Sequence, residues 1–189
     1  MKVCVFCASS PYLDDVYYEE ASSLGKVIAE NSWQLIYGGT GQGMMESLAR
    51  SAIEGGAHVK GVIPECIVQL GIASHDITEL VTTPDMKTRK AMMREEADAF
   101  IALPGGWGTL EEITEVITLK QLAQHNKPIV FVNTGGYYDA FFEFIAKSKE
   151  LKFISAKYDV LYKIVENTKE VADYIKSYRP PVNFNISKY

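Results

Sequence analysis

Short apolar runs rich in β-branched residues alternate along this chain with longer amphipathic stretches. In the first of these stretches Tyr17, Ala21, Leu24 and Ile28 are spaced by four, three and four residues, which places them on one face of a helix. The pattern predicts strands at residues 3–6, 34–37, 59–63, 77–81, 99–103 and 129–132, and further helices at 43–54, 86–97, 109–124, 137–149 and 168–178. Because the strands are apolar almost throughout, we expect a parallel sheet with helices on both faces: a three-layer α/β fold, doubly wound and Rossmann-like.

The alternation runs without a linker, repeat or low-complexity tract, so the sequence predicts one domain over residues 1–189. Arg179-Pro180-Pro181 is predicted to end the last helix, because proline lacks the N–H that a helix interior requires. Residues 183–189 are then expected to form a tail on the surface or on a partner subunit.

The composition is that of an ordinary soluble domain, with 47% hydrophobic and 23% charged residues among 189. The formal net charge of -5 argues against a general nucleic-acid binder, which usually carries a basic excess. The apolar run at the N-terminus is too short for a signal peptide or a membrane span. We therefore expect a cytoplasmic protein that binds neither nucleic acids nor membranes.

Cys4 and Cys7 form a C-x-x-C pair, a spacing that elsewhere binds zinc or carries out redox chemistry. Here the pair lies inside a predicted strand, where residues three apart face opposite sides of the sheet. The other residues that bind zinc in proteins are scattered without ligand spacing: Cys66, His58, His75 and His125. We expect structural thiols and no metal site.

Residues 104–112 read P-G-G-W-G-T-L-E-E and follow directly on the apolar run at 99–103. A buried strand is thus predicted to turn through three glycines into a helix that opens near Thr109. Glycines let the backbone approach a ligand closely, and the free N–H groups of a helix N-terminus bind anions, so the pattern favours a phosphate cradle. The alternative is an ordinary helix start capped by Gly108 or Thr109, in which Glu111 and Glu112 complement the dipole. A carboxylate beside a phosphate is reasonable where it acts on another part of the ligand, such as a ribose.

A second glycine cluster, residues 38–43, follows the predicted strand at 34–37. It is not a dinucleotide fingerprint, since Met44 stands where the third glycine of G-x-G-x-x-G belongs, and the chain contains no P-loop sequence. The cluster is either a tight turn or a second ligand contact. Because the carboxyl ends of parallel strands meet at one edge of the sheet, the two glycine-rich turns suggest one ligand lying across both.

Residues 85–90, D-M-K-T-R-K, place cations at the start of a predicted helix, where they oppose the helix dipole. Two interpretations are open. The segment is either a solvated basic face or an anion site in which the planar guanidinium of Arg89 binds phosphate or carboxylate.

With these motifs the chain resembles the LONELY GUY (LOG) family, the cytokinin riboside 5'-monophosphate phosphoribohydrolases that were long labelled possible lysine decarboxylases. The resemblance runs from Val3 to about Ile154. Its most specific elements are PGGxGTxxE, present as Pro104 through Glu112, and the arginine-lysine pair Arg89-Lys90. Weaker elements are V-F-C-A-S-S at 5–10, Y-G-G at 37–39, G-V-I-P at 61–64 and N-K-P at 126–128.

This resemblance implies a homodimer that hydrolyses the N-glycosidic bond of a nucleoside 5'-monophosphate, releasing a free base and ribose 5-phosphate without a cofactor. Arg89 and Glu112 are its implied catalytic pair, and Glu115 receives no role. The implied substrate site comprises Ser9, Gly39, Lys90, Gly105, Gly106, Gly108, Thr109, Leu110, Glu111 and Thr118. An anionic Glu112 near C1' would stabilise the positive charge that develops on the ribose. Whether it acts as nucleophile, as general base or through ribose hydroxyls is open at this stage.

The departures from the family pattern concern the base end of the substrate. Thr40 and Glu46 stand at family glycines, Lys87 replaces the histidine of M-H-x-R-K, and Gly71 stands where many relatives carry an acidic residue. AMP, a prenylated adenine ribotide and another purine monophosphate are all candidate substrates.

One other class of protein competes with a hydrolase. A non-catalytic carrier or sensor, similar to the molybdenum-cofactor carrier proteins, would bind a phosphorylated ligand without cleaving it, but would not need Arg89 and Glu112 in this arrangement. A pyridoxal phosphate decarboxylase is not supported, because no lysine lies in a recognisable cofactor-binding sequence.

Overall fold

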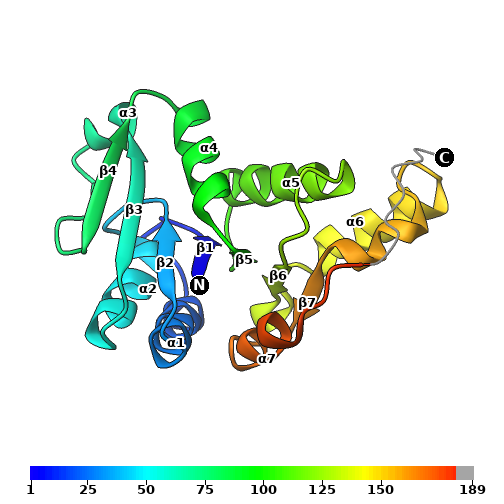
Figure 1. The fold of residues 1–189 in the computed structure, drawn as a ribbon, viewed down its shortest axis with the longest axis horizontal. Helices are drawn as coiled ribbons and strands as arrows, with labels where there is room; N and C mark the ends of the chain where they lie inside the picture. Colours follow the sequence, from blue (N-terminus) through cyan, green and yellow to red (C-terminus); the bar gives the residue numbers. More distant parts are fainter. Residues whose placement is uncertain (182–189) are drawn as a thin grey trace.

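The structure, a computed structural model, describes residues 1–181, and within them seven parallel strands form one sheet in the order β4-β3-β2-β1-β5-β6-β7 (Figure 1). The strands are β1 (Lys2–Phe6), β2 (Gln34–Tyr37), β3 (Val59–Pro64), β4 (Glu79–Thr83), β5 (Ala99–Ala102), β6 (Ile129–Val132) and β7 (Lys163–Val165). The central strands are almost wholly buried, as expected for parallel strands with helices on both faces.

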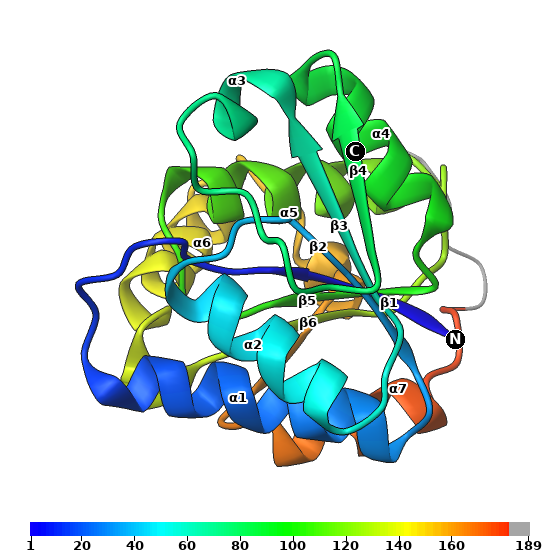
Figure 2. The ribbon, with the colours of Figure 1, turned by 90° about the vertical axis from the view of Figure 1, so that its left-hand side faces the viewer.

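Helices cover both faces of the sheet, which confirms the predicted three-layer doubly wound fold. Helices α1 (Asp15–Glu30), α2 (Gly43–Glu54) and α7 (Lys169–Ser177) contribute to the core on one face, while α4 (Met86–Glu96), α5 (Trp107–Gln121) and α6 (Asp139–Glu150) contribute to the core on the other. Figure 2 shows α1 and α2 on one side of the strands and α4 and α5 on the opposite side. The short helix α3 (Glu65–Val68) and the 3-10 segments η1 (Thr134–Gly136) and η2 (Ala156–Leu161) complete the described elements.

The side chains of β1 alternate between the two cores. Val3, Val5 and Cys7 belong to the α1–α2 side, whereas Cys4 and Phe6 belong to the α4–α5 side. The prediction that the two thiols diverge is therefore confirmed, and both are buried and free. In the described part of the chain, no cluster of three or more His, Cys, Asp or Glu side chains is placed to hold a metal ion.

Several element boundaries differ from the predicted ones. The helix after β5 begins at Trp107 rather than Thr109, with Gly106 at its N-cap, so neither Gly108 nor Thr109 caps it. Strand β4 starts two residues later than expected, and β7 was not predicted at all. The last helix ends at Ser177, two residues before Arg179. The predicted tail, 183–189, lies outside the described residues, and none of the described helices is long and apolar enough to cross a membrane.

The sheet order reverses at its centre, where β1 pairs with β2 on one side and with β5 on the other. Val3 lies opposite Ala99 in this register and Phe6 opposite Ala102, so the two strands end together. Ligands of doubly wound sheets bind beyond the carboxyl ends of the strands at such a switch point. The fold thus directs attention to the turns that follow Phe6 and Ala102.

Candidate active site

A pocket of about 350 Å³ lies at the carboxyl ends of β1 and β5. It is bounded by the turn after β1 and by the first turns of α2, α4 and α5. Its lining residues are Cys7, Ala8, Ser9, Ser10, Met45, Met86, Arg89, Gly106, Trp107, Gly108, Thr109, Glu111 and Glu112. The Arg89 region and the glycine-rich helix start, which are separate in the sequence, therefore share one cavity.

Arg89 and Glu112 form an ion pair beneath this pocket. Nη1 of Arg89 donates to Oε1 of Glu112 at 2.5 Å, and the two side chains are only 8% and 6% exposed. A buried ion pair of this kind is weak evidence for stability, because desolvation offsets much of the attraction. Within the described residues Oε2 of Glu112 has no hydrogen-bond partner, which leaves one carboxylate oxygen for a ligand.

Arg89 is held on two further sides. Its Nε donates to the carbonyl oxygen of Val62 in β3 at 2.9 Å. A Cβ atom added to Gly38 would lie 2.6 Å from Nη2 of Arg89, so the absence of a side chain at Gly38 makes room for the guanidinium. The guanidinium is thereby held by β3 and α5 and fits against the turn after β2, as expected for a group that orients a partner.

Burial sets the protonation of Glu112. Desolvation raises the pKa of its carboxyl above the usual glutamate value, and the positive charge of Arg89 opposes this rise without cancelling it. A carboxyl with a raised pKa takes up and releases a proton closer to neutral pH, which suits acid–base chemistry.

The start of α4 explains how Arg89 enters the core. Asp85 caps the helix by accepting a hydrogen bond from the backbone N–H of Thr88 at 2.6 Å, which offsets the cations that follow it. Arg89 is then buried, so the interpretation of this segment as a solvated basic face is wrong for Arg89.

Lys90 points toward the first turns of α5 instead of into the pocket. It forms ion pairs with Glu111 and, at 3.4 Å, with Glu115, which also pairs with Arg94 at 3.0 Å. These contacts hold α4 against α5. Glu115, to which the resemblance gives no role, is thus part of an inter-helix ion-pair network.

The three glycines of P-G-G-W-G-T have different surroundings. A Cβ atom on Gly105 would lie 2.1 Å from Oγ1 of Thr109, whereas a Cβ on Gly106 or Gly108 would meet no described atom within 4 Å. None of the three has a positive φ, so a left-handed turn does not explain them. Gly105 permits internal packing, while Gly106 and Gly108 keep the space before the N-terminus of α5 open.

Two tyrosines after β6 hold the turn that leads into this helix. The hydroxyl of Tyr138 donates to the carbonyl oxygen of Leu103 at 2.6 Å, and that of Tyr137 donates to the carbonyl oxygen of Gly105 at 2.9 Å. Asn133 supports them by accepting from the backbone N–H of Tyr138 at 2.7 Å. The helix N-terminus is therefore positioned by side chains that lie 32 and 35 residues further along the sequence than their partners.

The structure brings together most of the predicted site residues. Ser9, Arg89, Gly106, Gly108, Thr109, Glu111 and Glu112 line the pocket. Lys90, Gly105 and Leu110 lie next to lining residues. Gly39, with a φ of 75°, packs near Ile63 and Leu80, and Thr118 donates to the carbonyl oxygen of Thr114 and lines another cavity. Their roles in substrate binding stay predictions.

The second glycine cluster is accounted for by turn geometry and packing. Gly39 and Gly43 both have positive φ, and a Cβ on Gly43 would lie 2.5 Å from the carbonyl oxygen of Ser10. These contacts bring α2 against the turn after β1. Backbone conformation and packing therefore account for these two glycines, which favours the tight-turn interpretation of residues 38–43.

Sequence reasoning missed six residues that line the pocket: Cys7, Ala8, Ser10, Met45, Met86 and Trp107. Most of them lie inside motifs that were recognised, such as V-F-C-A-S-S and P-G-G-W-G-T. Their position beside predicted site residues could have indicated them. Most of them are apolar, however, and an apolar side chain in such a place is usually assigned to the core.

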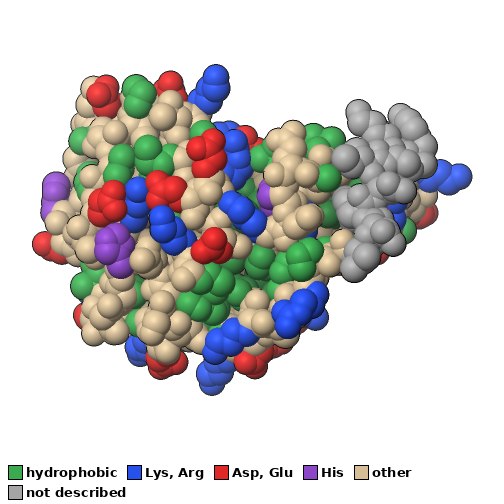
Figure 3. Space-filling model, viewed as in Figure 1, with side chains coloured by type: hydrophobic (Ala, Val, Ile, Leu, Met, Phe, Trp, Pro, Cys, Tyr) green, Lys and Arg blue, Asp and Glu red, His purple; other side chains and the backbone are tan. Residues whose placement is uncertain are grey.

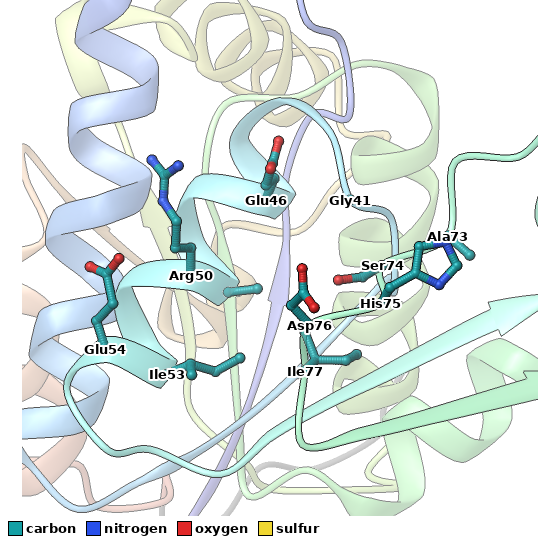
Figure 4. Close-up of a pocket in the computed structure, with 11 residues that line it drawn as sticks. Gly41, Glu46, Arg50, Ile53, Glu54, Ala73, Ser74, His75, Asp76 and Ile77 are labelled. Atoms are coloured by element: carbon teal, nitrogen blue, oxygen red, sulfur yellow. The ribbon is translucent and has the colours of Figure 1, made fainter.

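A separate cavity of about 330 Å³ lies between α2 and the loop before β4 (Figure 4). Glu46, Arg50 and Glu54 lie along α2 on one side, and Ser74 and Asp76 lie on the other. None of the predicted site residues lines it.

On the face drawn in Figure 3, acidic and basic side chains are interspersed.

Comparison with known proteins identifies the family of this chain. A family model described as "Possible lysine decarboxylase" matches residues 45–175. The chain is 41% identical over 187 residues to cytokinin riboside 5'-monophosphate phosphoribohydrolase LOG7 of Arabidopsis thaliana, covering 99% of this chain and 86% of the relative. The chain belongs to the LOG family. A second relative of this LOG-family chain is the probable cytokinin riboside 5'-monophosphate phosphoribohydrolase LOGL6 of Oryza sativa subsp. japonica. The two are 39% identical over 179 residues, which cover 95% of this chain and 72% of the relative.

Solved structures share the fold of this LOG-family chain. The molybdenum cofactor carrier protein of Chlamydomonas reinhardtii superposes with a TM-score of 0.69 at 20% identity, covering 93% of this chain and 95% of the carrier. At that identity the likeness establishes the Rossmann-like fold alone.

Proposed function

We propose that this protein hydrolyses the N-glycosidic bond of a nucleoside 5'-monophosphate, AMP or a cytokinin riboside 5'-monophosphate, to a free base and ribose 5-phosphate. The observation that carries the proposal is that the buried Arg89–Glu112 pair and the open N-terminus of α5 face one pocket. The names of the LOG relatives support this activity.

The N-terminus of α5 is the phosphate end of the proposed site. Free N–H groups in its first turn, with the positive end of the helix dipole, favour a dianionic 5'-phosphate. Gly106 and Gly108 leave room for the phosphate oxygens, and the hydroxyls of Ser9 and Thr109 supply further donors in the same cavity. Gly105 acts indirectly, because its missing side chain lets Thr109 pack against the turn.

Glu112 lies one helical turn further along α5, where the ribose of a phosphate-anchored nucleotide would lie. As the C1'–N bond breaks, its electrons leave with the base and positive charge develops on the ribose, which the carboxylate stabilises. Water then adds its oxygen to C1' and loses a proton to Oε2 of Glu112. Glu112 passes this proton to the departing base, so the base leaves neutral and the carboxylate is restored. Arg89 holds Oε1 and so fixes the direction of the reactive oxygen.

The predicted contacts of Lys90, Leu110 and Glu111 belong to the rim of this site. Lys90 is not suited to pyridoxal phosphate chemistry, because the hydrogen bond that its ammonium donates to Glu111 raises its pKa, whereas a Schiff base needs an uncharged amine. The residues at the pocket therefore do not fit the decarboxylase suggested by the family description.

We further propose that the protein is a cytoplasmic homodimer without nucleic-acid or membrane partners. Large apolar side chains are exposed on α6 and in the segment after it, namely Phe144, Leu151, Phe153 and Val160. Exposed apolar patches of this kind mark protein contacts. Analytical ultracentrifugation tests the dimer, and a monomer at micromolar concentration would contradict it.

The deciding experiment incubates the protein with a panel of nucleoside 5'-monophosphates and measures free base and ribose 5-phosphate. We expect release from at least one purine nucleotide, and no release by Arg89→Ala or Glu112→Ala variants whose melting transitions show that they fold. Tight binding without release by the wild type would instead support a carrier.

A further inference from the structure

Trp107 is an exposed aromatic residue beside the proposed phosphate site. It is the first residue of α5, it lines the pocket, and it is 89% exposed. Its backbone belongs to the anion-binding helix N-terminus, a role that any residue type can fill. The indole itself makes no ring contact with another described residue, so the fold does not account for it.

An exposed tryptophan leaves a large apolar surface in water, and burying such a side chain is favourable. A tryptophan on the edge of a ligand pocket is therefore expected to pack against an apolar part of the bound ligand. Trp33, the second tryptophan of the sequence, shows the contrast, since it is 6% exposed within the core.

Two methionines also contribute apolar surface to the pocket. Met45 comes from α2 and Met86 from α4, and both line the cavity together with Trp107. Met45 is packed against the core, whereas Met86 is 42% exposed. Methionine is unbranched and polarisable, so it adapts to flat aromatic ligands of different shape.

The pocket is thus divided by chemistry. The helix N-terminus, Thr109 and Glu112 provide polar contacts, and Met45, Met86 and Trp107 provide large apolar side chains. In a nucleoside monophosphate the phosphate and ribose are polar, and the base is the flat aromatic part. Once the polar groups are assigned to the phosphate and ribose, the base is the part of the ligand that matches the apolar side chains of the lining.

We propose that Trp107 stacks on the base of the bound nucleotide, with Met45 and Met86 beside it, and that this contact makes the site prefer purines to pyrimidines. The inference rests on the proposed binding of a nucleoside 5'-monophosphate and adds the residue that recognises its base. Stacking on an aromatic side chain tolerates different bases but strengthens with the size of the ring system. A purine therefore gains more from Trp107 than a pyrimidine.

Tryptophan fluorescence tests the contact directly, because Trp107 is the exposed one of only two tryptophans. In a Glu112→Gln background that prevents turnover, AMP is expected to quench the emission, and ribose 5-phosphate, which has no base, is expected to change it little. In Trp107→Phe, which leaves only Trp33, the AMP response should disappear.

Affinity supplies the second measurement. Trp107→Ala is expected to weaken AMP binding about tenfold or more and ribose 5-phosphate binding less than twofold, while Trp107→Phe retains most of the AMP affinity. The ratio of kcat/KM for AMP to that for UMP should fall in Trp107→Ala. Melting curves confirm that the variants fold, as expected for a change at an exposed position.

Equal affinity losses for AMP and ribose 5-phosphate, or no loss for either, would overturn the inference. A Trp107→Ala protein that becomes a smaller species in gel filtration with an unchanged AMP-to-UMP ratio would place the indole in a subunit contact instead. The two proposals fail separately. AMP quenching without cleavage by the wild type would contradict the hydrolase alone, whereas cleavage with an unchanged base preference in Trp107→Ala would contradict the stacking alone.

Discussion

Gly38 and Arg89 occupy adjoining space: a Cβ atom on Gly38 would lie 2.6 Å from Nη2 of the arginine. Real Cβ atoms are not found so close to a nitrogen, so any side chain at position 38 must displace the guanidinium. The glycine that follows β2 is therefore tied to the arginine of α4, and through it to Glu112 of α5. Three motifs that are distant in the sequence depend on one another at this point.

Gly38→Ala is predicted to lower kcat by about 10- to 100-fold, since a shift of about 1 Å in a catalytic group has an effect of that size. The measurement is steady-state release of ribose 5-phosphate, with thermal melting to confirm folding. Gly56→Ala is the matched control. It introduces a Cβ at a positive φ of 86° but into open space, so it should cost about 1 kcal/mol of stability and leave kcat unchanged. Full activity in Gly38→Ala would show that the position of Arg89 is not important.

The raised pKa of Glu112 predicts the acid side of the pH–rate profile. The active form is the carboxylate, so kcat/KM should rise with pH as Glu112 loses its proton, with a midpoint above the ordinary glutamate value of about 4.3. Glu115→Gln, one turn further along α5, should leave this midpoint in place. A midpoint at or below the ordinary value would mean that Arg89, rather than burial, dominates the environment of Glu112.

Tyr138→Phe tests the support of the turn before α5. The hydroxyl is buried and donates to the carbonyl oxygen of Leu103, and its removal leaves that oxygen without this partner while the ring still packs. We expect the free energy of unfolding in urea to fall by about 1–2 kcal/mol. Tyr12→Phe removes a hydroxyl from a side chain that is 92% exposed and should change stability by less than about 0.5 kcal/mol. Equal effects of the two substitutions would contradict the role of Tyr138.

The lowered pKa of Lys120 predicts that this residue makes a pH-dependent contribution to the free energy of unfolding. It is buried in α5, donates to the carbonyl oxygen of Leu161 at 2.8 Å, and has its pKa lowered to about 8 by desolvation. Between pH 8 and about 10 the unfolded chain keeps this proton while the folded protein loses it, so folding becomes more favourable as the pH rises. Relative to Lys120→Met, the wild type should gain up to about 1.4 kcal/mol per pH unit in urea unfolding over this range. The comparison cancels the buried cysteines and tyrosines, which titrate in both proteins, and a constant difference between the two would contradict the prediction.

Elements with a strong periodic pattern were predictable. Helix α2 begins and ends where the pattern places it, and the strands at the centre of the sheet are uniformly apolar. Strand β7 was not predictable, because its three residues, Lys163 to Val165, carry no alternation and pair with β6 only in the folded chain. Trp107 at the start of α5 was likewise hidden, since a helix start set by Gly106 leaves no capping side chain in the sequence.

The candidate site was predictable in its parts but not in its arrangement. Spacing along α5 separates Glu111, on the rim, from Glu112, which is buried, but only the resemblance to a family indicated which of the two matters. The burial of Arg89 depends on Gly38, Val62 and Glu112, three contacts distant in the sequence. A local pattern of cations at a helix start contains none of that information.

Cys4 on β1 and Cys7 directly after it have opposite orientations, which has a practical consequence for experiments in solution. Both thiols are buried, and desolvation raises the pKa of each, so neither supplies the thiolate that reacts with maleimides. Cys66, on α3 at the β3–β4 side of the sheet, is exposed. The natural sequence therefore accepts a single dye or spin label without any substitution, and energy transfer between labels on two copies would report directly on how subunits associate.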